Sequence, residues 1–349
     1  MCGRTEISII VSTYNRATSL RETLSCLSAQ TLHTDEFEII VVDDGSSDNT
    51  EAVVQEFASQ HSCVRIRYMK HHRNRSKAAA CNSGAKLAAG RLIVFTDDDI
   101  RPVPGWLAGH LKRHKMAGGK VAVTGLVLLP NDWAKRSNWV RYANSNYLKS
   151  ESIRGRESGK LPPNRLAGGN TSLPLDLFYS AGMFDESMRR GEDCELACKL
   201  FIAGVPLLYE PAALVYHYAD YIQSIDDTLL AFRKFYESDW RTIQEKYPWF
   251  LQKYGHWFLL PYDPCFDGTL RSLRKAATKL LAKRRIQQWL VQLLKWIDGI
   301  PFFYCRALYD YTLACEALDA MRPRENKCDP SRNDSCRKNG AIISGVDNR

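Results

Sequence analysis

Short apolar runs alternate with helical spacings along the first part of the chain. The β-favouring runs are residues 6–11, 37–42, 64–69 and 92–95. Each is followed by a stretch with apolar residues three or four positions apart, as Leu20, Leu24 and Leu27 are after the first run. Strands that alternate with helices in this way predict an α/β fold with a parallel, doubly wound sheet.

The second part of the chain has longer and less regular segments. We predict strands at residues 121–129, 207–209 and 213–218, and helices at 174–181, 192–203, 225–246, 270–297 and 302–320. Residues 131–166 are polar and aromatic without periodicity, which predicts a long binding loop or lid. The pattern divides the chain into an α/β domain at 1–222, a helical C-terminal extension at 223–321 and a disordered polar tail at 322–349.

The run at residues 92–95 leads straight into three successive carboxylates, Asp97, Asp98 and Asp99. Continuous apolar character is typical of a strand buried inside a parallel sheet, and open α/β sheets bind ligands at the carboxyl ends of their strands. Three adjacent like charges repel one another, so the cluster requires a cation or hydrogen-bond donors beside it. A divalent metal bound to phosphates would satisfy that requirement.

The composition is that of a globular protein. The chain has 349 residues, of which 45% are hydrophobic and 25% are charged, enough for one large domain with an appendage. No run approaches the roughly 18 consecutive apolar residues of a membrane-spanning helix, and the N-terminus enters a predicted strand without a signal-peptide pattern. The eleven cysteines lack paired C-x-x-C spacing, which argues against a zinc site or a disulfide framework. We therefore expect a cytoplasmic protein.

The net charge of +9 lies mainly near the C-terminus, where residues 271–349 hold sixteen Lys or Arg against eight Asp or Glu. Within residues 270–297, leucines at helical spacing are surrounded by basic residues. This is the pattern of a basic amphipathic helix that contacts an anionic membrane, here at its inner face. The alternative is a helix packed on the α/β domain with a solvated basic face. We expect no nucleic-acid partner, because no recognition motif accompanies the charge.

Six motifs follow one another along the chain: VSTYNR, VVDDGSSDNT, NRSKAAACNSGAKLAAGRLIVFTDDDI, GGNTSL, GEDCEL and VYHY. Their order and spacing resemble those of the family 2 inverting glycosyltransferases with a GT-A fold, over residues 6–218. The resemblance implies a GT-A-type, doubly wound, mostly parallel sheet, with a donor-binding half at about 1–100 and an acceptor-binding half at about 101–222. It also implies a hexosyltransferase-like enzyme that uses a nucleotide-diphosphate sugar.

On the donor side, the resemblance makes Asp43 the acceptor of the uracil N3 proton and thereby favours a UDP-linked sugar. Asp44 is expected beside the donor. The alternative is a tight turn in which both aspartates bond backbone amides. The loop after the first strand would approach the base through Thr13, Tyr14 and Arg16.

A second loop would face the donor's phosphates. Arg75 and Lys77 are candidate phosphate ligands, because cations favour that neighbour, although a solvated basic loop explains them equally well. The family often has a glycine where this chain has Ser76. The backbone of this loop is therefore the part of the donor site that the resemblance defines least.

By the same resemblance, Asp99 coordinates a divalent metal, Mn²⁺ or Mg²⁺, on the diphosphate. Asp97 and Asp98 would belong to the donor-binding residues: Asp97 would contact the ribose or lie beside the metal, and Asp98 would support the cluster. His217 in VYHY would complete the metal site, since a neutral imidazole is a common metal ligand. A histidine with a structural role is the alternative.

Transfer to an acceptor needs a general base, because a neutral hydroxyl is a poor nucleophile. The motif GEDCEL places Glu192 and Asp193 at the start of a predicted helix, where backbone amides stabilise carboxylates. The resemblance makes Asp193 the base and Glu192 the acid that positions the acceptor; the alternative is that both only favour the helix dipole. Gly168, Gly169 and Asn170 would bring backbone close to the transferred sugar or the acceptor.

The sequence thus predicts a metal-assisted, inverting glycosyltransferase whose acceptor is a glycan, a lipid-linked molecule or another hydroxyl compound. Inversion follows if Asp193 activates the acceptor for in-line attack opposite the diphosphate. A non-catalytic nucleotide-sugar binding protein is the alternative from another class, and the presence of Asp193 argues against it. A nucleotidylyltransferase is less consistent, because VSTYNRATS lacks a glycine-rich triphosphate loop.

Overall fold

The computed structural model describes residues 5–147, 159–250, 276, 283–300 and 303–321. The predicted tail at 322–349 lies outside these residues, as do 148–158 of the predicted loop and most of the first half of the predicted helix at 270–297.

The predicted alternation of strands and helices is confirmed up to residue 117. The elements are β1 (Ile7–Thr13), α1 (Ala17–Ser28), β2 (Phe37–Asp43), α2 (Thr50–Gln60), β3 (Arg65–Lys70), α3 (Lys77–Leu87), β4 (Leu92–Asp97), β5 (Ile100–Pro102) and α4 (Trp106–Ala117). Every residue of β1 and β2 is buried, as expected for apolar, β-branched runs inside a sheet that is covered on both faces. The short strand β5, directly after the acidic cluster, was not predicted.

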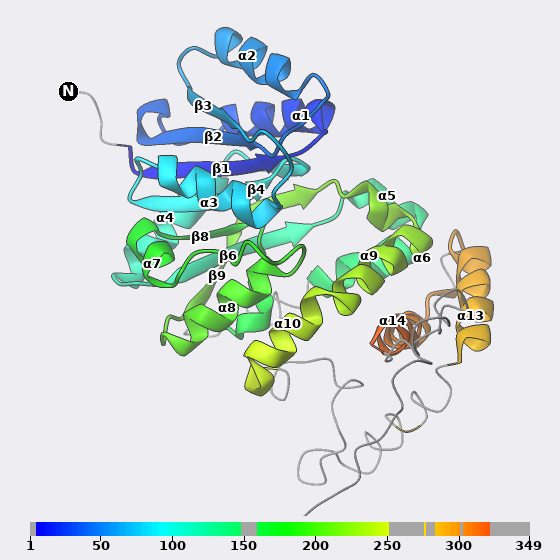
Figure 1. The fold of residues 1–349 in the computed structure, drawn as a ribbon. Coiled ribbons are helices and arrows are strands. Elements are labelled where there is room, and N and C mark those ends of the chain that lie inside the picture. Colours follow the sequence, from blue (N-terminus) through cyan, green and yellow to red (C-terminus); the bar gives the residue numbers. More distant parts are fainter. Residues whose placement is uncertain (1–4, 148–158, 251–275, 277–282, 301–302, 322–349) are drawn as a thin grey trace, which may run out of the picture.

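The remaining part of the chain is mostly helical. Its elements are β6 (Ala122–Leu128), α5 (Asn131–Arg136), α6 (Asn138–Tyr147), β7 (Lys160–Leu161), β8 (Thr171–Pro174), α7 (Leu175–Ser180), α8 (Glu192–Ile202), β9 (Leu207–His217), α9 (Ile225–Glu237), α10 (Asp239–Lys246), α13 (Arg284–Ile297) and α14 (Arg306–Ala320). Figure 1 shows the sheet with α8, α9 and α10 below it and with α13 and α14 to one side.

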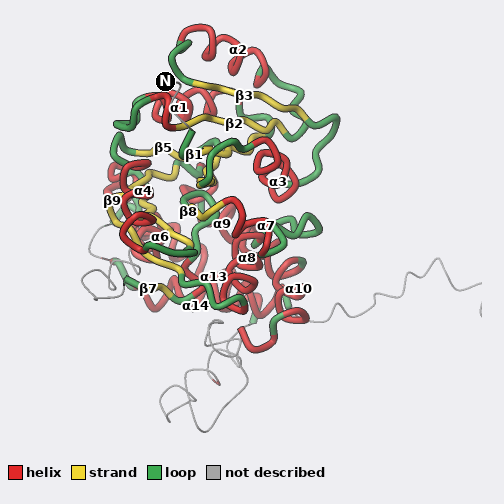
Figure 2. The backbone as a smooth tube through the Cα atoms, turned by 90° about the vertical axis from the view of Figure 1, so that its left-hand side faces the viewer, coloured by secondary structure: helices red, strands yellow, loops and turns green. Residues whose placement is uncertain are grey.

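The strands form one sheet in the order β3-β2-β1-β4-β8-β6-β9-β5, with β7 paired to β9. Pairing is parallel from β3 to β4 and between β6 and β9. Strands β5, β7 and β8 pair antiparallel with their neighbours. The α/β class is confirmed. The parallel, doubly wound part of the sheet is formed by β1 to β4, so the sheet as a whole is more mixed than the sequence predicts. The edge-on view in Figure 2 shows strands between helices.

Two hydrophobic clusters cover the two faces of the sheet. On one face, α1, α2 and α4 pack on alternate residues of β1 and β2. On the other face, α3, α7 and α8 pack on Ile10, Ile93 and Phe95. The carboxyl ends of β1, β2 and β4 remain between these layers, and this is where the acidic cluster lies.

The C-terminal helices pack on the α/β domain. The apolar stripe of α13, which includes Leu294 and Ile297, joins Trp139 of α6 and Tyr309 of α14 in one buried cluster. A further cluster joins Met188 before α8 to α10 and α14. For its described part, α13 therefore has the arrangement expected of the packed-helix alternative. Among the described helices, none combines the length and apolar character needed to cross a bilayer.

Three element predictions were wrong. Residues 131–147 form α5 and α6 rather than an irregular loop, because Trp139, Val140 and Tyr142 are buried against the C-terminal helices. The predicted strands at 207–209 and 213–218 are one strand, β9, whose pairing with β6 shifts register after Gly125. The predicted helix at 225–246 is broken at Ser238 into α9 and α10.

Candidate active site

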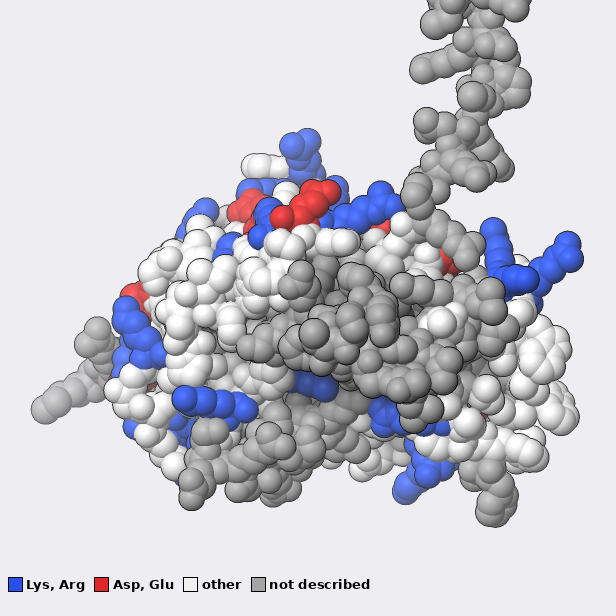
Figure 3. Space-filling view, turned by 90° about the horizontal axis from the view of Figure 1, so that it is seen from below, with Lys and Arg blue, Asp and Glu red and all other residues white. Residues whose placement is uncertain are grey.

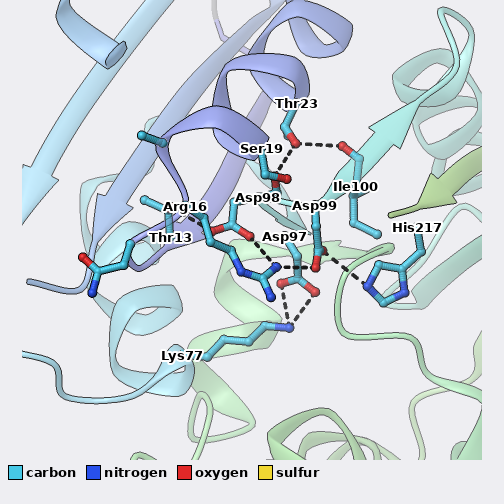
Figure 4. A network of polar contacts seen from close by, with 12 residues as sticks. Thr13, Arg16, Ser19, Thr23, Lys77, Asp97, Asp98, Asp99, Ile100 and His217 are labelled. Carbon is cyan, nitrogen blue, oxygen red and sulfur yellow. Dashed lines mark hydrogen bonds and ion pairs between the residues drawn. The ribbon is translucent and has the colours of Figure 1, made fainter. Parts of the chain in front are cut away.

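The carboxyl ends of three strands bring the predicted donor residues together. Thr13 on β1 pairs with Asp43 on β2, and Ser12 pairs with Asp97 on β4. The antiparallel pair β5–β9 sets Ile100 opposite His217, so the histidine lies beside the acidic cluster although it is 118 residues further along the chain than Asp99. Figure 4 shows Thr13, the acidic cluster and His217 close together.

Side chains from β1 and α1 hold the acidic turn in place. Thr13 Oγ1 donates to Asp98 Oδ2 at 2.8 Å, and the hydroxyls of Ser19 and Thr23 donate to the Asp98 carbonyl at 2.8 and 2.7 Å. Ser19 and Thr23 lie four residues apart on α1 and so share a face. These contacts fix Asp98 within the turn, and its supporting role in the cluster stays a prediction.

Two cations of the chain already offset part of the acidic charge. Arg16 lies 2.5 Å from Asp99 Oδ2 and 3.3 Å from Asp98 Oδ1, and Lys77 Nζ lies 2.6 Å from Asp97 Oδ1. Burial alone would lower the pKa of Lys77, but the carboxylates of Asp97 and Glu192 raise it well above its usual value. Burial, together with the Asp99 charge, raises the pKa of Asp98 to about 6. The cluster is thus partly neutralised by residues of the chain itself.

Asp99 and His217 form the part of the site that could hold a metal. Asp99 Oδ1 is buried, has no hydrogen bond of good geometry among the described residues, and faces His217 Nε2 at 3.3 Å. Burial would raise the pKa of Asp99, but His217 and Arg16 hold it well below its usual value. An ionised oxygen next to an imidazole nitrogen fits a divalent ion. Among the described residues, no group of three or more His, Cys, Asp or Glu is placed to hold one.

The two aspartates after β2 differ in their surroundings. Asp43 is fully buried, and its oxygens accept hydrogen bonds from Ser46 N and the Tyr68 hydroxyl, both at 2.7 Å. Asp44 accepts from the backbone amides of Arg75 and Ser76. It also lines a cavity beside the acidic cluster, which we call the donor-side cavity. Of the two, it is Asp44 that reaches the cavity wall.

The two cations of the second loop also separate. The Arg75 guanidinium pairs with Glu186 at 2.9 Å and does not line the cavities described below. Lys77 begins α3 and lines both cavities, where it lies between Asp97 and Glu192. Tyr14, 46% exposed, lines the donor-side cavity beside Thr13.

Ser76 has a backbone φ of +140°, a region that L-residues rarely adopt. Its amide donates to Asp44 at 2.9 Å, and its hydroxyl caps α3 by accepting from Ala79 N. The family's frequent glycine at this position is explained by that φ. In this chain the loop keeps the conformation that glycine would favour, and the helix cap opposes the strain.

Glu192 and Asp193 begin α8 and face different surroundings. Glu192 is buried next to Lys77, and burial raises its pKa although the lysine opposes the rise. The Asp193 carboxylate accepts from Cys194 N at 2.7 Å and from Gly168 N at 3.2 Å, and it reaches the cavity. Backbone amides thus orient a carboxylate that remains accessible.

The glycine pair lies between the two acidic sites. A Cβ on Gly169 would be 2.7 Å from Asp97 Oδ2, and one on Gly168 would be 3.1 Å from Asp193 Cβ, so both positions require close approach of the backbone. Asn170 lies behind them and is fully buried: it accepts from Trp106 Nε1 and donates to the carbonyls of Leu126 and Ala213. Its geometry suits support of the loop rather than contact with a ligand.

Two adjoining cavities bring these groups together. The donor-side cavity of about 540 Å³ is lined by residues of β1 and β4 and by the loops after them. The acceptor-side cavity of about 450 Å³ is lined by the glycine pair and by Asp193. The residues that line both are Lys77, Asp97, Arg189, Arg190, His217 and Tyr221. A ligand could therefore extend from the acidic cluster to Asp193.

The sequence analysis missed several residues of the site. Ser19 and Thr23 could have been found from their spacing of four on the face of a helix that follows the first motif. Arg189 and Arg190 directly precede GEDCEL, and two consecutive cations before an acidic motif are a recognisable signal. Nothing in the local sequence marks Tyr221.

A mixed α/β sheet with acids at the strand ends and a carboxylate at a nearby helix start defines a GT-A-type protein. A mannosyltransferase from Pyrobaculum calidifontis, solved in complex with GDP-Man and Mn²⁺, is similar with a TM-score of 0.58 and 20% identity, over 93% of this chain and 89% of that one. This likeness confirms the GT-A-type fold.

The sequence model described as Glycosyl transferase family 2 matches residues 8–164. Validoxylamine A glucosyltransferase of Streptomyces hygroscopicus subsp. jinggangensis is 28% identical over 224 residues, which are 58% of this chain and 52% of the relative. Pre-mycofactocin glycosyltransferase of Mycobacterium tuberculosis is 29% identical over 219 residues, 61% of this chain and 42% of the relative. These matches bear out the resemblance to the family 2 glycosyltransferases, and the chain spans about half the length of these relatives.

Proposed function

We propose that the protein transfers a sugar from a nucleotide-diphosphate sugar to an acceptor hydroxyl with inversion at the anomeric carbon. The observation that supports this most strongly is the pair of adjoining cavities, with the acidic cluster at one end and the Asp193 carboxylate at the other. The leaving diphosphate needs cationic surroundings, which Arg16, Lys77 and a metal held beside Asp99 would supply. The attacking hydroxyl needs a base, which Asp193 would supply.

The donor's nucleotide would lie along the ends of β1 and β2, with Thr13, Tyr14 and Asp44 beside it. Asp43 is proposed for uracil recognition by resemblance alone, and its oxygens are engaged by Ser46 and Tyr68. The UDP-linked donor therefore stays a proposal. The alternative is a GDP-linked sugar, as in the complex of the similar mannosyltransferase with GDP-Man.

Asp99 and His217 would hold a divalent ion, Mn²⁺ or Mg²⁺, on the diphosphate, and donor oxygens would supply further ligands. When bound, such an ion would neutralise charge on the departing nucleoside diphosphate. Arg16 and Lys77 supply the cations that offset the repulsion among the acids within the chain itself. The similar mannosyltransferase was solved with Mn²⁺ bound, which supports the choice of metal.

On the acceptor side, Asp193 takes the proton of the acceptor hydroxyl while that oxygen bonds to the anomeric carbon. The bond from this carbon to the diphosphate oxygen breaks on the opposite face, so the configuration inverts. Gly168 N and Cys194 N hold the carboxylate in one orientation. The buried Glu192 carboxylate holds Lys77 at the start of α8. In this way Glu192 would position the residues that line the acceptor-side cavity.

The acceptor is proposed to be a glycan, a lipid-linked molecule or another hydroxyl compound. Peripheral contact with a membrane through residues 270–297 remains part of the proposal. In the described part of this segment, Trp289 and Trp296 are 64% and 74% exposed, and three consecutive cations, Lys283, Arg284 and Arg285, are exposed at the start of α13. Exposed indoles next to cations suit an anionic lipid surface. Figure 3 shows Lys and Arg side chains at several places around the edge of the molecule seen from below.

The domain division of the sequence analysis is retained as a proposal, with a catalytic region at 1–222 and a helical extension at 223–321. A non-catalytic nucleotide-sugar binding protein would need the donor-side cavity but not an accessible, amide-oriented Asp193. A nucleotidylyltransferase would need a triphosphate loop after β1, where this chain has Tyr14, Asn15 and Arg16.

A donor-hydrolysis screen tests the proposal. UDP-, GDP- and dTDP-linked sugars are incubated with the chain in Mn²⁺, Mg²⁺ or EDTA, and the released nucleoside diphosphate is measured. We expect one class of donor to be hydrolysed and the release to stop in EDTA. Absence of both binding and turnover for every donor would contradict the enzymatic function, and turnover that EDTA leaves unchanged would contradict the metal.

A further inference from the structure

The two arginines before α8 are the cations of the site that carry no acidic partner among the described residues. Arg16 and Lys77 are both bound to carboxylates of the acidic cluster. Arg189 and Arg190 are exposed, line both cavities, and form no ion pair with any residue that the structure describes. Two uncompensated guanidinium groups at the junction of the cavities favour an anion there.

The backbone of these two arginines is held by the C-terminal extension. Asp239, the first residue of α10, is buried, and its Oδ1 accepts from Arg189 N at 2.9 Å while its Oδ2 accepts from Arg190 N at 3.0 Å. The Ser238 hydroxyl donates to the same carboxylate at 2.8 Å. A charged carboxylate that accepts two adjacent amides fixes the direction of both residues that carry them.

Further contacts fix the same loop on either side. Met188 is buried in the cluster of α10 and α14. Gly191 has a φ of +78°, and a Cβ there would be 2.6 Å from the Phe235 ring of α9. Lys246 at the end of α10 forms an ion pair with Asp185. The loop from 185 to 191 is therefore supported along its length by α9 and α10.

We propose that Arg189 and Arg190 bind the diphosphate of the donor, and that Asp239 is a positioning residue through which the helical extension sets their place. The inference rests on the proposed function and deepens it. Guanidinium groups suit phosphate because their planar donors form paired hydrogen bonds with its oxygens. The helical extension is then a working part of the active site, although it lies outside the family motifs.

The arginines are tested by equilibrium binding of UDP, GDP, inorganic pyrophosphate, uridine and guanosine to the full chain with Mn²⁺. For Arg189→Ala and Arg190→Ala we expect the affinity for the diphosphate ligands to fall about tenfold or more, the usual effect of losing a hydrogen bond to a charged group. Nucleoside affinity should stay within about twofold. Arg241→Ala, an exposed arginine on α10 outside both cavities, is the matched control and should change neither.

Asp239 is tested through the arginines. Asp239→Asn replaces one amide acceptor with a donor and should weaken diphosphate binding about fivefold or more while leaving nucleoside binding unchanged. In the Arg189→Ala/Arg190→Ala background, the same change should have no further effect on diphosphate affinity. A structural role alone would lower both kinds of affinity in both backgrounds.

The outcomes separate this inference from the proposed function. Diphosphate affinity that is unchanged in the arginine variants, or nucleoside affinity that falls equally, overturns the inference and leaves the glycosyltransferase proposal standing. Failure of the unsubstituted chain to bind any nucleoside diphosphate overturns both. Both arginine side chains are exposed, so their variants keep the test decisive if Asp239→Asn does not fold.

Discussion

At the residue scale, the site depends on which charged side chains find partners. Arg75, an expected phosphate ligand, is paired with Glu186, whereas Arg189 and Arg190 line the cavities. The sequence identifies the acids Asp97 to Asp99 because they end an apolar strand, and it identifies Asp193 because it begins a helix. It does not identify the partner of a surface arginine, since Arg75 and Glu186 are 111 residues apart and meet only through packing.

The strain at Ser76 gives a prediction for stability. Ser76→Gly should raise the free energy of unfolding by about 1 kcal/mol, because it removes a strained φ that costs of order 1–3 kcal/mol and loses only a few tenths of a kcal/mol of helix capping. Ser76→Ala keeps the strain and loses the cap, so it should lower the same quantity by about 1 kcal/mol. Urea unfolding of the three proteins measures both changes.

If glycine and alanine lower stability equally at position 76, the strain does not exist in the folded protein. The hydrogen bond to the Asp44 carboxylate should be kept in both variants, because the backbone amide of residue 76 donates it.

At the element scale, the success of the sequence analysis follows the strength of each pattern. The strands β1, β2 and β4 are correctly predicted because their residues are buried without exception up to the edge of the site. Helix α6 is missed because its buried residues, such as Trp139, pack on helices more than 80 residues further along. Such contacts leave no period in the local sequence.

Helix α4 gives a prediction for pH dependence. Its His110 and His114 both contact the Ser172 hydroxyl, at 2.8 and 2.9 Å. Burial lowers the pKa of His110 to about 3, although the hydrogen bond from His110 Nε2 to Asn170 Oδ1 opposes the shift. Burial also lowers the pKa of His114 to about 4. Both histidines are therefore neutral in the fold at pH values where the unfolded chain already binds their protons.

Stability should fall as the pH decreases from about 6.5 towards 4, because the unfolded state then holds more protons. Each histidine contributes at most about 1.4 kcal/mol per pH unit. Urea midpoints at pH 7.5, 6.5 and 5.5 measure the slope, which should be smaller in His114→Gln and unchanged in His33→Gln, an exposed control. A midpoint that stays constant over this range would show that His110 and His114 are not buried as neutral groups.

At the scale of the whole molecule, the helical extension is bound to the α/β domain through one face and presents another outwards. Leu290, Leu294 and Ile297 of α13 are buried, whereas Trp289 and Trp296, seven residues apart, lie on its exposed side. The sequence predicts the amphipathic pattern but not which of its two uses applies. The structure combines a packed apolar stripe with an exposed pair of indoles.

That arrangement gives a prediction for membrane association. The chain should float with vesicles containing about a third anionic lipid and not with neutral vesicles, because indoles and cations act together at an anionic surface. Trp289→Ser/Trp296→Ser should lose most of the flotation. Met116→Ser/Ile202→Ser, which changes two exposed apolar side chains on α4 and α8, is the control and should float like the parent. Equal flotation of all three proteins, or none for the parent, contradicts the proposed contact.

The proposed reaction depends on Asp193 as the base that activates the acceptor hydroxyl. Asp193→Asn keeps the size of the side chain and one of the two oxygens that accept from Gly168 N and Cys194 N, but it cannot take a proton. The most direct measurement is the single-turnover rate of sugar transfer in this variant, together with its affinity for the donor that the screen identifies. We expect donor affinity within about twofold of the parent and transfer slower by about 10²-fold or more. Transfer at the parental rate would contradict the account.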